Sequence, residues 1–305
     1  MNHSILFGNG LNLITKENPS WIDLLNSINN KAANRKNLPY TIIYEYMYLC
    51  KAQEAHPSKK DVELTIKKEI AERLIEIKTN EIYERIKSLP ARNFITTNYD
   101  YAFCEQFKKP VIEENSEEIY SIRRHKEYDC GTKLWFIHGE IGKPKSIMLG
   151  LDHYCGSIGK IDSYLKGTYQ KKETKHILKK LEAKEFDSTS WIELFFNSNL
   201  HIIGFGLSYI ESDIWWLLHK RSRLAKQKIL NNKIFFYTTD SDPEKFDLLQ
   251  RLDIEITYRK PNNEDHTSAY KELIDQMEEN MMDVKQTMAQ PYLSTSLTIK
   301  NTLNQ

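Results

Sequence analysis

The chain has 305 residues, 28% of them charged, and its acidic and basic side chains nearly cancel to a formal net charge of +1. This balance argues against a nucleic-acid-binding protein with a strongly basic surface, and the length suffices for one large domain with a sizeable core. No apolar run approaches the roughly 20 residues that a membrane-spanning helix needs, so we expect a soluble protein without a membrane partner.

The cysteines, Cys50, Cys104, Cys130 and Cys155, include no Cys-x-x-Cys pair. This spacing disfavours a structural zinc site, so we expect no metal. Scattered thiols, together with a first strand that leaves no room for a targeting segment, favour a reducing cytoplasm.

The first expected element is an apolar strand at residues 4–7, followed at once by Gly8, Asn9 and Gly10. Glycines at such a turn let a ligand approach the backbone closely, and the N–H groups there favour an anion such as a pyrophosphate. A plain structural turn is the alternative interpretation. Because Leu13 stands where the dinucleotide fingerprint has its third glycine, an ordinary hydride-transfer dehydrogenase is disfavoured.

Residues 31–90 show helical periodicity almost throughout, after a first helix predicted to start at Ser20. The stretch is far longer than the dozen or so residues of a simple crossover between parallel strands. We therefore expect a helical insertion at 31–90 that forms a cap or an oligomer interface.

The run from Asn93 to Tyr101 is the stretch around which the chain is organised. A short buried strand ends there in small polar residues, including Thr97, Asn98 and Asp100. In an open α/β sheet, ligands usually bind at the carboxyl ends of the strands. Capping of a turn by the Asn and Asp side chains is the alternative interpretation.

His138 and Gly139 follow the next expected strand, at 133–137. An imidazole titrates near neutral pH and transfers protons, so His138 is a candidate base, with a structural histidine as the alternative. Asp152 and His153, which follow an expected strand at 146–149, are a lesser candidate for fixing a loop.

Residues Gly204, Gly206 and Ser208 belong to a second glycine-rich turn, after a strand at 200–203. We expect this turn to face phosphate or ribose, although Ser208 is also explained as the N-cap of a helix that runs through Leu224.

Two further strands are expected at 233–237 and 254–258. Thr238 and Thr239 end the first of them and are candidates for contact with an adenosine ribose. His201, by contrast, lies inside a strand and is predicted to pack in the core.

Strands that alternate with helices predict the fold class: an α/β protein with a Rossmann-like, doubly wound, mostly parallel sheet and a large helical insertion after the first strand. We expect one domain at 1–282, with a second, basic helical insertion at 155–190, and a loose polar tail at 283–305.

Taken in order, these motifs resemble those of the sirtuin-like family, in its bacterial NAD-cleaving branch associated with antiphage defence. The matching elements, between roughly residues 4 and 260, are the turn Gly8 to Gly10, the Thr-x-Asn-x-Asp element Thr96 to Asp100, His138-Gly139, the run Leu149 to Tyr154, and the turn Gly204 to Ser208.

The resemblance implies roles for individual residues. Asn98 would position the attacking water or the nicotinamide ribose, Asp100 would hold the nicotinamide carboxamide, and His138 would act as a base toward a ribose hydroxyl or water. The residues expected to bind the dinucleotide are Gly8, Asn9, Gly10, Asn12, Thr97, Gly204, Gly206, Ser208, Thr238 and Thr239.

Two departures from sirtuin deacetylases disfavour removal of acyl groups from lysine. No four-cysteine zinc module follows His138, and Asn12 leads into Leu-Ile-Thr-Lys where deacetylases carry a Gly-Ile-Pro-x-Phe-Arg loop. Both losses favour a reaction in which water attacks C1′ of the ribose.

The resemblance therefore predicts an NAD+ glycohydrolase that converts NAD+ to ADP-ribose and nicotinamide as an abortive-infection antiphage effector. NAD+ would be its substrate, and no further cofactor is expected. Because an unrestrained enzyme would poison its host, we expect control by homo-oligomerisation or by a partner, such as a HerA-type ATPase or a nucleotide-sensing protein.

Three alternatives stay open. A non-catalytic module that senses NAD+ or ADP-ribose has no need of both Asn98 and His138. An ADP-ribosyltransferase would transfer label to protein or nucleic acid. The AbiH-type abortive-infection proteins share the Gly-Asn-Gly start and are an alternative family with a similar site.

Overall fold

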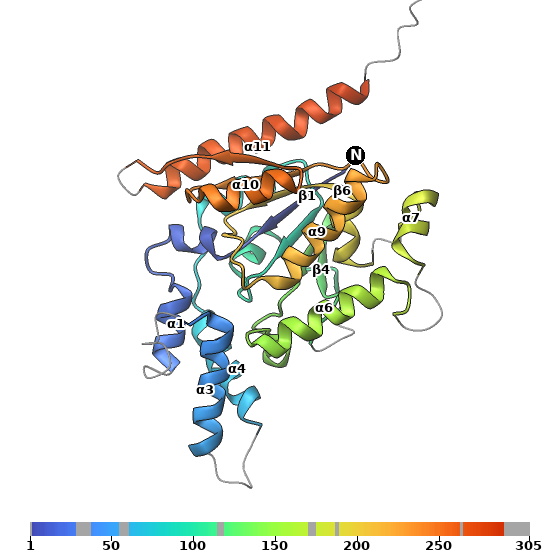
Figure 1. Cartoon of the computed structure of the whole chain (residues 1–305). Coiled ribbons are helices and arrows are strands. Elements are labelled where there is room, and N and C mark those ends of the chain that lie inside the picture. The colour runs from blue at the N-terminus through green and yellow to red at the C-terminus, as the bar shows by residue number, and fades with distance from the viewer. Residues whose placement is uncertain are drawn as a thin grey trace, which may run out of the picture.

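The computed structural model describes residues 2–28, 38–54, 61–114, 119–169, 175–186, 189–262 and 265–289. Its centre is an eight-stranded sheet in the order β3-β4-β5-β2-β1-β6-β7-β8 (Figure 1). The strands are β1 (Asn2–Phe7), β2 (Asn93–Thr96), β3 (Ile112–Glu114), β4 (His125–Tyr128), β5 (Thr132–Phe136), β6 (Ser198–Ile203), β7 (Ile234–Thr238) and β8 (Ile254–Tyr258). Strands β5, β2, β1, β6, β7 and β8 are parallel, which confirms the predicted Rossmann-like fold class.

Helices cover both faces of the sheet because alternate residues of each buried strand point to opposite sides. Ile5 and Phe7 of β1 belong to one hydrophobic cluster, and Leu6 belongs to the other. The first cluster includes α1 (Trp21–Ile28), α3 (Tyr40–Glu54), α4 (Val62–Leu74), α5 (Glu81–Ser88) and α11 (His266–Ala289). The second includes α6 (Leu151–Leu165), α7 (Ile177–Ala183), α8 (Leu194–Asn197), α9 (Ser212–Lys226) and α10 (Pro243–Arg251).

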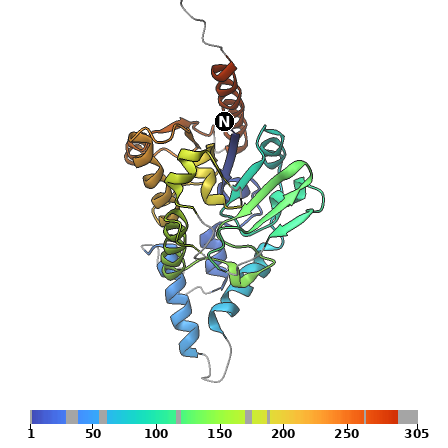
Figure 2. The same cartoon turned by 90° about the vertical axis from the view of Figure 1, so that its right-hand side faces the viewer.

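Three of these helices, α3, α4 and α5, occupy described parts of the stretch 31–90 between β1 and β2. Helices α3 and α4 project away from the sheet in both views (Figures 1 and 2). The interpretation of this stretch, and of 155–190, as insertions stays a prediction; residues 29–37, 55–60, 170–174 and 187–188 lie outside the described part of the chain.

Two strands in the middle of the chain were not expected from the sequence. β3 and β4 form an antiparallel pair, and β4 also pairs antiparallel with β5, in a part of the chain for which no strand was predicted. Both strands are short and rich in charged residues, so they lack the apolar alternation that indicates a strand.

The strand predicted at 146–149 is wrong. Pro144–Ser146 forms a single turn of 3-10 helix, and Met148 N–H donates one hydrogen bond to the His138 carbonyl without starting a ladder. Because α6 already begins at Leu151, Asp152 and His153 lie in the first turn of a helix and not at a strand end. The Nδ1 atom of His153 accepts hydrogen bonds from the N–H groups of Leu149 and Gly150, each at 2.9 Å, so it does fix this loop.

Two predicted helix boundaries also change. Helix α9 begins at Ser212 and not at Ser208, because residues 208–211 form a separate turn closed by the bond from Glu211 N–H to the Ser208 carbonyl. Helix α11 continues to Ala289, so the boundary predicted at 282 falls inside it, and residues 290–305 lie outside the described part of the chain. No helix within the described ranges is long and apolar enough to cross a membrane.

Candidate active site

The sheet register brings the carboxyl ends of five strands to one level. Phe7 of β1 pairs with Thr96 of β2 and Ile203 of β6, Thr96 pairs with Phe136 of β5, and Ile203 pairs with Tyr237 of β7. The residues that follow these positions therefore meet at one edge of the sheet. The strand order reverses at β1, since β2 lies on one side of it and β6 on the other, and ligand crevices form at such switch points.

A cavity of about 320 Å³ lies at this edge, at the lower end of the size range of small-molecule sites. Residues from all five strand ends contribute to its lining. The predicted site residues that line it are Asn9, Gly10, Thr97, Asn98, His138, Gly204, Gly206 and Ser208.

The remaining predicted residues do not line this cavity. Gly8 is buried beneath it, against Phe205 and Thr97. Thr238 is also buried, and its Oγ1 accepts a hydrogen bond from the N–H of Asp240, which faces the cavity in place of the two threonines.

Asp100 and Asn12 lie behind Asn98 in a buried hydrogen-bond network. Asn12 Nδ2 donates to Asp100 Oδ2 at 2.8 Å, and the other carboxylate oxygen accepts from Ala102 N–H. Asn12 Oδ1 accepts from the Tyr83 hydroxyl at 2.7 Å. Burial raises the pKa of Asp100, opposed by these hydrogen bonds.

Asn98 is held from two sides. Its backbone N–H donates to Thr96 Oγ1 at 3.0 Å, and its Nδ2 donates to the Tyr83 hydroxyl at 3.3 Å. These bonds leave the side-chain oxygen of Asn98 without a hydrogen-bond partner among the described residues. A fixed amide with a free carbonyl oxygen at the cavity wall can orient a hydroxyl group or a water molecule.

The two glycine turns contact each other directly. Gly10 N–H donates to the Gly204 carbonyl at 2.8 Å, which joins the end of β1 to the end of β6. Gly204 has a positive φ of 61°, and a Cβ atom there would lie 2.4 Å from the Leu11 side chain. Only glycine fits this close approach of two backbones.

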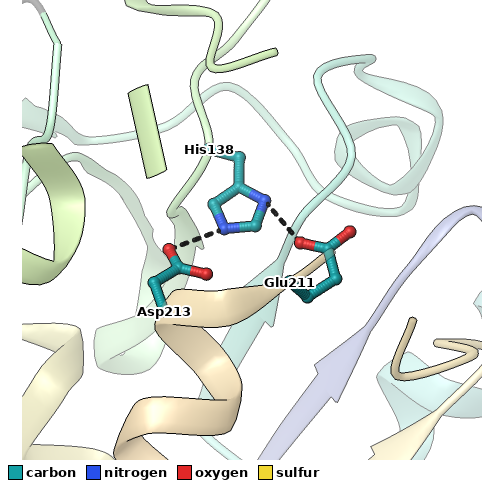
Figure 3. A group of neighbouring side chains, drawn as sticks. All are labelled: His138, Glu211 and Asp213. Atoms are coloured by element: carbon teal, nitrogen blue, oxygen red, sulfur yellow. Dashed lines mark hydrogen bonds and ion pairs between the residues drawn. The ribbon is translucent and has the colours of Figure 1, made fainter. Parts of the chain in front are cut away.

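His138 lies between two carboxylates, as Figure 3 shows. Its Nε2 is 3.1 Å from Asp213 Oδ2, and its Nδ1 is 3.6 Å from Glu211 Oε2. Gly139, next in the chain, has a φ of 108°, and a Cβ atom there would lie 2.4 Å from the Ser146 carbonyl oxygen, so the position requires glycine. The loop after β5 thus turns sharply and leaves the imidazole at the cavity wall.

Opposing effects set the protonation of this group. Burial lowers the pKa of His138, but the negative charges of Asp213 and Glu211 outweigh it and raise the pKa above the ordinary value. Burial also raises the pKa of Glu211, opposed by His138 and assisted by Asp213. The histidine is therefore a stronger base than a histidine in water.

His138, Glu211 and Asp213 are also the group of described residues whose ligand atoms lie close enough to hold a metal ion, within 4.8 Å of one another. The two carboxylates contact different nitrogen atoms of the ring (Figure 3). Three ligands of one ion would instead converge on a common point. We interpret the group as a pair of ionic contacts to one histidine.

Four residues of the site were missed at the sequence level. Glu211 and Asp213 flank the start of α9, a region in which the sequence indicated a role for Ser208 alone. Tyr154 lines the cavity and donates to Glu211 Oε2 at 3.0 Å, although only its run had been noted. Tyr83 carries no local signal, because only the packing of α5 against the sheet brings its hydroxyl to Asn98.

The doubly wound sheet and its edge cavity define a Rossmann-like ligand-binding protein. The model of a SIR2-like domain matches residues 92–255, more than half of the chain, so the chain belongs to the SIR2-like family. This result confirms the predicted sirtuin-like relation. It supports an NAD-related function in general and is consistent with NAD-dependent enzyme activity. A comparison with curated proteins found no match.

Proposed function

We propose that the chain hydrolyses the N-glycosidic bond of NAD+ and releases nicotinamide and ADP-ribose. The observation that carries this proposal is the presence of Asn98 and His138 on the wall of one cavity, together with both glycine turns. A module that only binds nucleotide has no use for an amide and a raised-pKa imidazole at the same place.

The order of the strands supports the placement of the substrate. The glycine turns follow the adjacent strands β1 and β6, where backbone N–H groups suit a pyrophosphate. Asn98 follows β2 and His138 follows β5, which come next on one side. A dinucleotide laid along this edge therefore carries its nicotinamide ribose toward Asn98 and His138.

The chemistry required is mainly orientation and electrostatics. As the bond from C1′ to nicotinamide breaks, its electron pair goes to the ring nitrogen, and the positive charge moves from the ring to the sugar. Asn98 orients the incoming water or the ribose hydroxyls, and His138 accepts the proton that the water loses.

The test is nicotinamide release by the purified chain, assayed over a wide range of protein concentrations because control by assembly is part of the proposal. We expect Asn98→Ala and His138→Ala to lower turnover at least about 100-fold. His219→Ala on the exposed side of α9 is the matched control and should retain wild-type turnover. Undiminished turnover in both cavity variants would discard the assignment.

The two rival activities give different products in the same assay. An ADP-ribosyltransferase would attach label from NAD+ to protein or nucleic acid, whereas a sensor would bind NAD+ or ADP-ribose without releasing nicotinamide.

We further propose that the enzyme acts in abortive infection and is restrained by self-assembly or by a regulatory protein, because free NAD+ hydrolysis kills its host. Cells that express the wild-type chain should lose NAD+ only after phage infection, and cells that express His138→Ala should not. NAD+ loss without infection would argue against such restraint.

A further inference from the structure

The charges on the cavity wall are unevenly distributed. Among the described residues that line it, Glu211 and Asp240 carry carboxylates and none is a lysine or an arginine. Lys245 lies close by, but its Nζ is held by the Gly206 carbonyl at 3.1 Å and by Asp242 at 3.4 Å. The wall is thus negative, which suits a reaction that develops positive charge on the substrate.

Glu211 is the carboxylate that lies next to His138. Its Oε2 accepts the Tyr154 hydroxyl at 3.0 Å and lies 3.6 Å from His138 Nδ1. Its side chain keeps about 20% of its surface exposed, although its neighbours are buried. Contacts from two other parts of the chain therefore hold this carboxylate in one orientation at the wall of the cavity.

Asp213 is placed differently. It is fully buried, and its Oδ2 accepts from Ser157 Oγ at 3.0 Å and faces His138 Nε2. Its Oδ1 accepts from the N–H of Ile214. Because a carboxylate only accepts, the Nε2 of a neutral His138 carries the proton, and the lone pair of Nδ1 points to the side where Glu211 lies.

We propose that Glu211 is a further catalytic residue that faces the nicotinamide ribose and stabilises its positive charge, and that Asp213 is a positioning residue for His138. The inference rests on the proposed NAD+ hydrolysis. When C1′ loses nicotinamide, the Glu211 carboxylate faces the resulting oxocarbenium ion. Water then bonds to C1′, its proton moves to His138 Nδ1, and the imidazolium is held between the two carboxylates until Glu211 passes the proton to solvent.

Glu211→Gln tests the charge alone, since glutamine keeps an oxygen that accepts the Tyr154 hydroxyl. We expect turnover to fall about 100-fold, with KM changed less than about threefold, because preorganised groups that act on transition-state charge have effects of this size. Asp152→Asn is the matched control: it removes one negative charge from the exposed start of α6, outside the cavity, and should leave turnover unchanged.

Two further measurements separate catalysis from structure. Added formate should raise the turnover of Glu211→Ala at least about tenfold, because a small carboxylate fills the vacated position. A purely structural role of Glu211 predicts no such increase. Asp213→Asn should move the acidic limb of the pH–rate profile to lower pH, because the charge that raises the pKa of His138 is gone.

The outcomes are distinguishable. If the wild-type chain releases nicotinamide and Glu211→Gln keeps more than about a third of its turnover, the role of Glu211 is overturned and the hydrolase stands. If formate fails to rescue Glu211→Ala, the role is likewise overturned. If the wild-type chain neither binds nor cleaves NAD+, the proposed function falls, and the inference falls with it.

Discussion

A buried hydrogen-bond chain on the sheet predicts that acid destabilises the fold through one histidine. Asn280 Nδ2 donates to the Tyr237 hydroxyl at 2.9 Å, and this hydroxyl lies 3.0 Å from His201 Nδ1. His201 Nε2 lies 3.0 Å from His3 Nδ1. A neutral His201 fits both of its hydrogen bonds, because it accepts from the Tyr237 hydroxyl at Nδ1 and donates to His3 at Nε2. A second proton on His201 would remove the acceptor that Tyr237 needs.

The size of the effect follows from the pKa of His201. Burial, assisted by His3, lowers this pKa from 6.5 to about 3. His201 therefore binds a proton below about pH 6.5 in the unfolded chain, but only below about pH 3 in the folded chain. The contribution to stability is complete above pH 6.5 and is lost as the pH falls. At about 1.4 kcal/mol per pH unit below 6.5, the loss of stability amounts to about 2 kcal/mol at pH 5.

The assay compares the wild-type chain with His201→Gln by urea unfolding, followed by tryptophan fluorescence at pH 7 and pH 5. At pH 7 we expect the variant to be less stable by about 1–3 kcal/mol, because buried hydrogen bonds are lost. Between pH 7 and pH 5 the wild-type chain should lose about 2 kcal/mol more than the variant does. Equal losses in the two proteins would refute the reasoning, since His125 and His153, whose pKa values burial also lowers, are present in both.

Three further substitutions test the cavity wall and the side chain that anchors Asn98 behind it. Gly204→Ala should lower the free energy of unfolding by about 2–4 kcal/mol, because it adds both backbone strain and a clash with Leu11. In Gly206→Ala the new Cβ atom meets no atom within 4 Å, so the free energy of unfolding should change by less than about 0.5 kcal/mol. Chemical denaturation measures both values, and similar losses in the two variants would contradict the prediction. Tyr83→Phe should lower the free energy of unfolding by about 1–3 kcal/mol, because buried hydrogen bonds of the Tyr83 hydroxyl are lost. It should also lower the turnover of NAD+ more than it raises KM, because the Asn98 side chain loses the hydroxyl that holds it. An unchanged turnover would show that Asn98 needs no such support.

The sequence was sufficient to predict where the edge cavity lies, because parallel strands in register carry their carboxyl ends to one edge. The motifs after β1, β2, β5 and β6 could therefore be recognised separately and assigned to one crevice. The side chain that faces the crevice was less predictable. After β7 the prediction favoured Thr238 and Thr239, but the bond from Asp240 N–H to Thr238 Oγ1 turns the chain so that Asp240 lines the cavity.

The partners of the central residues depend on packing between distant segments. Asn98 is anchored by Tyr83 of α5, and His138 is fixed by Asp213 at the start of α9. Local periodicity indicates that a helix exists, but it does not specify the rotation with which the helix meets the sheet. The run at 146–149 resembled a strand because Ile147 and Met148 are buried and apolar, yet no strand among the described residues pairs with them.

The central position of β1 has a consequence for synthesis of the protein. This strand is synthesised long before one of its partners, β6, whose Ser198 pairs with Asn2. At about 5–20 residues per second, the interval between them is roughly 10–40 s. During that time one edge of an apolar strand has no native neighbour and needs protection by chaperones. A translation product that stops short of Gly204 lacks the turn that contacts Gly10 and closes one side of the cavity.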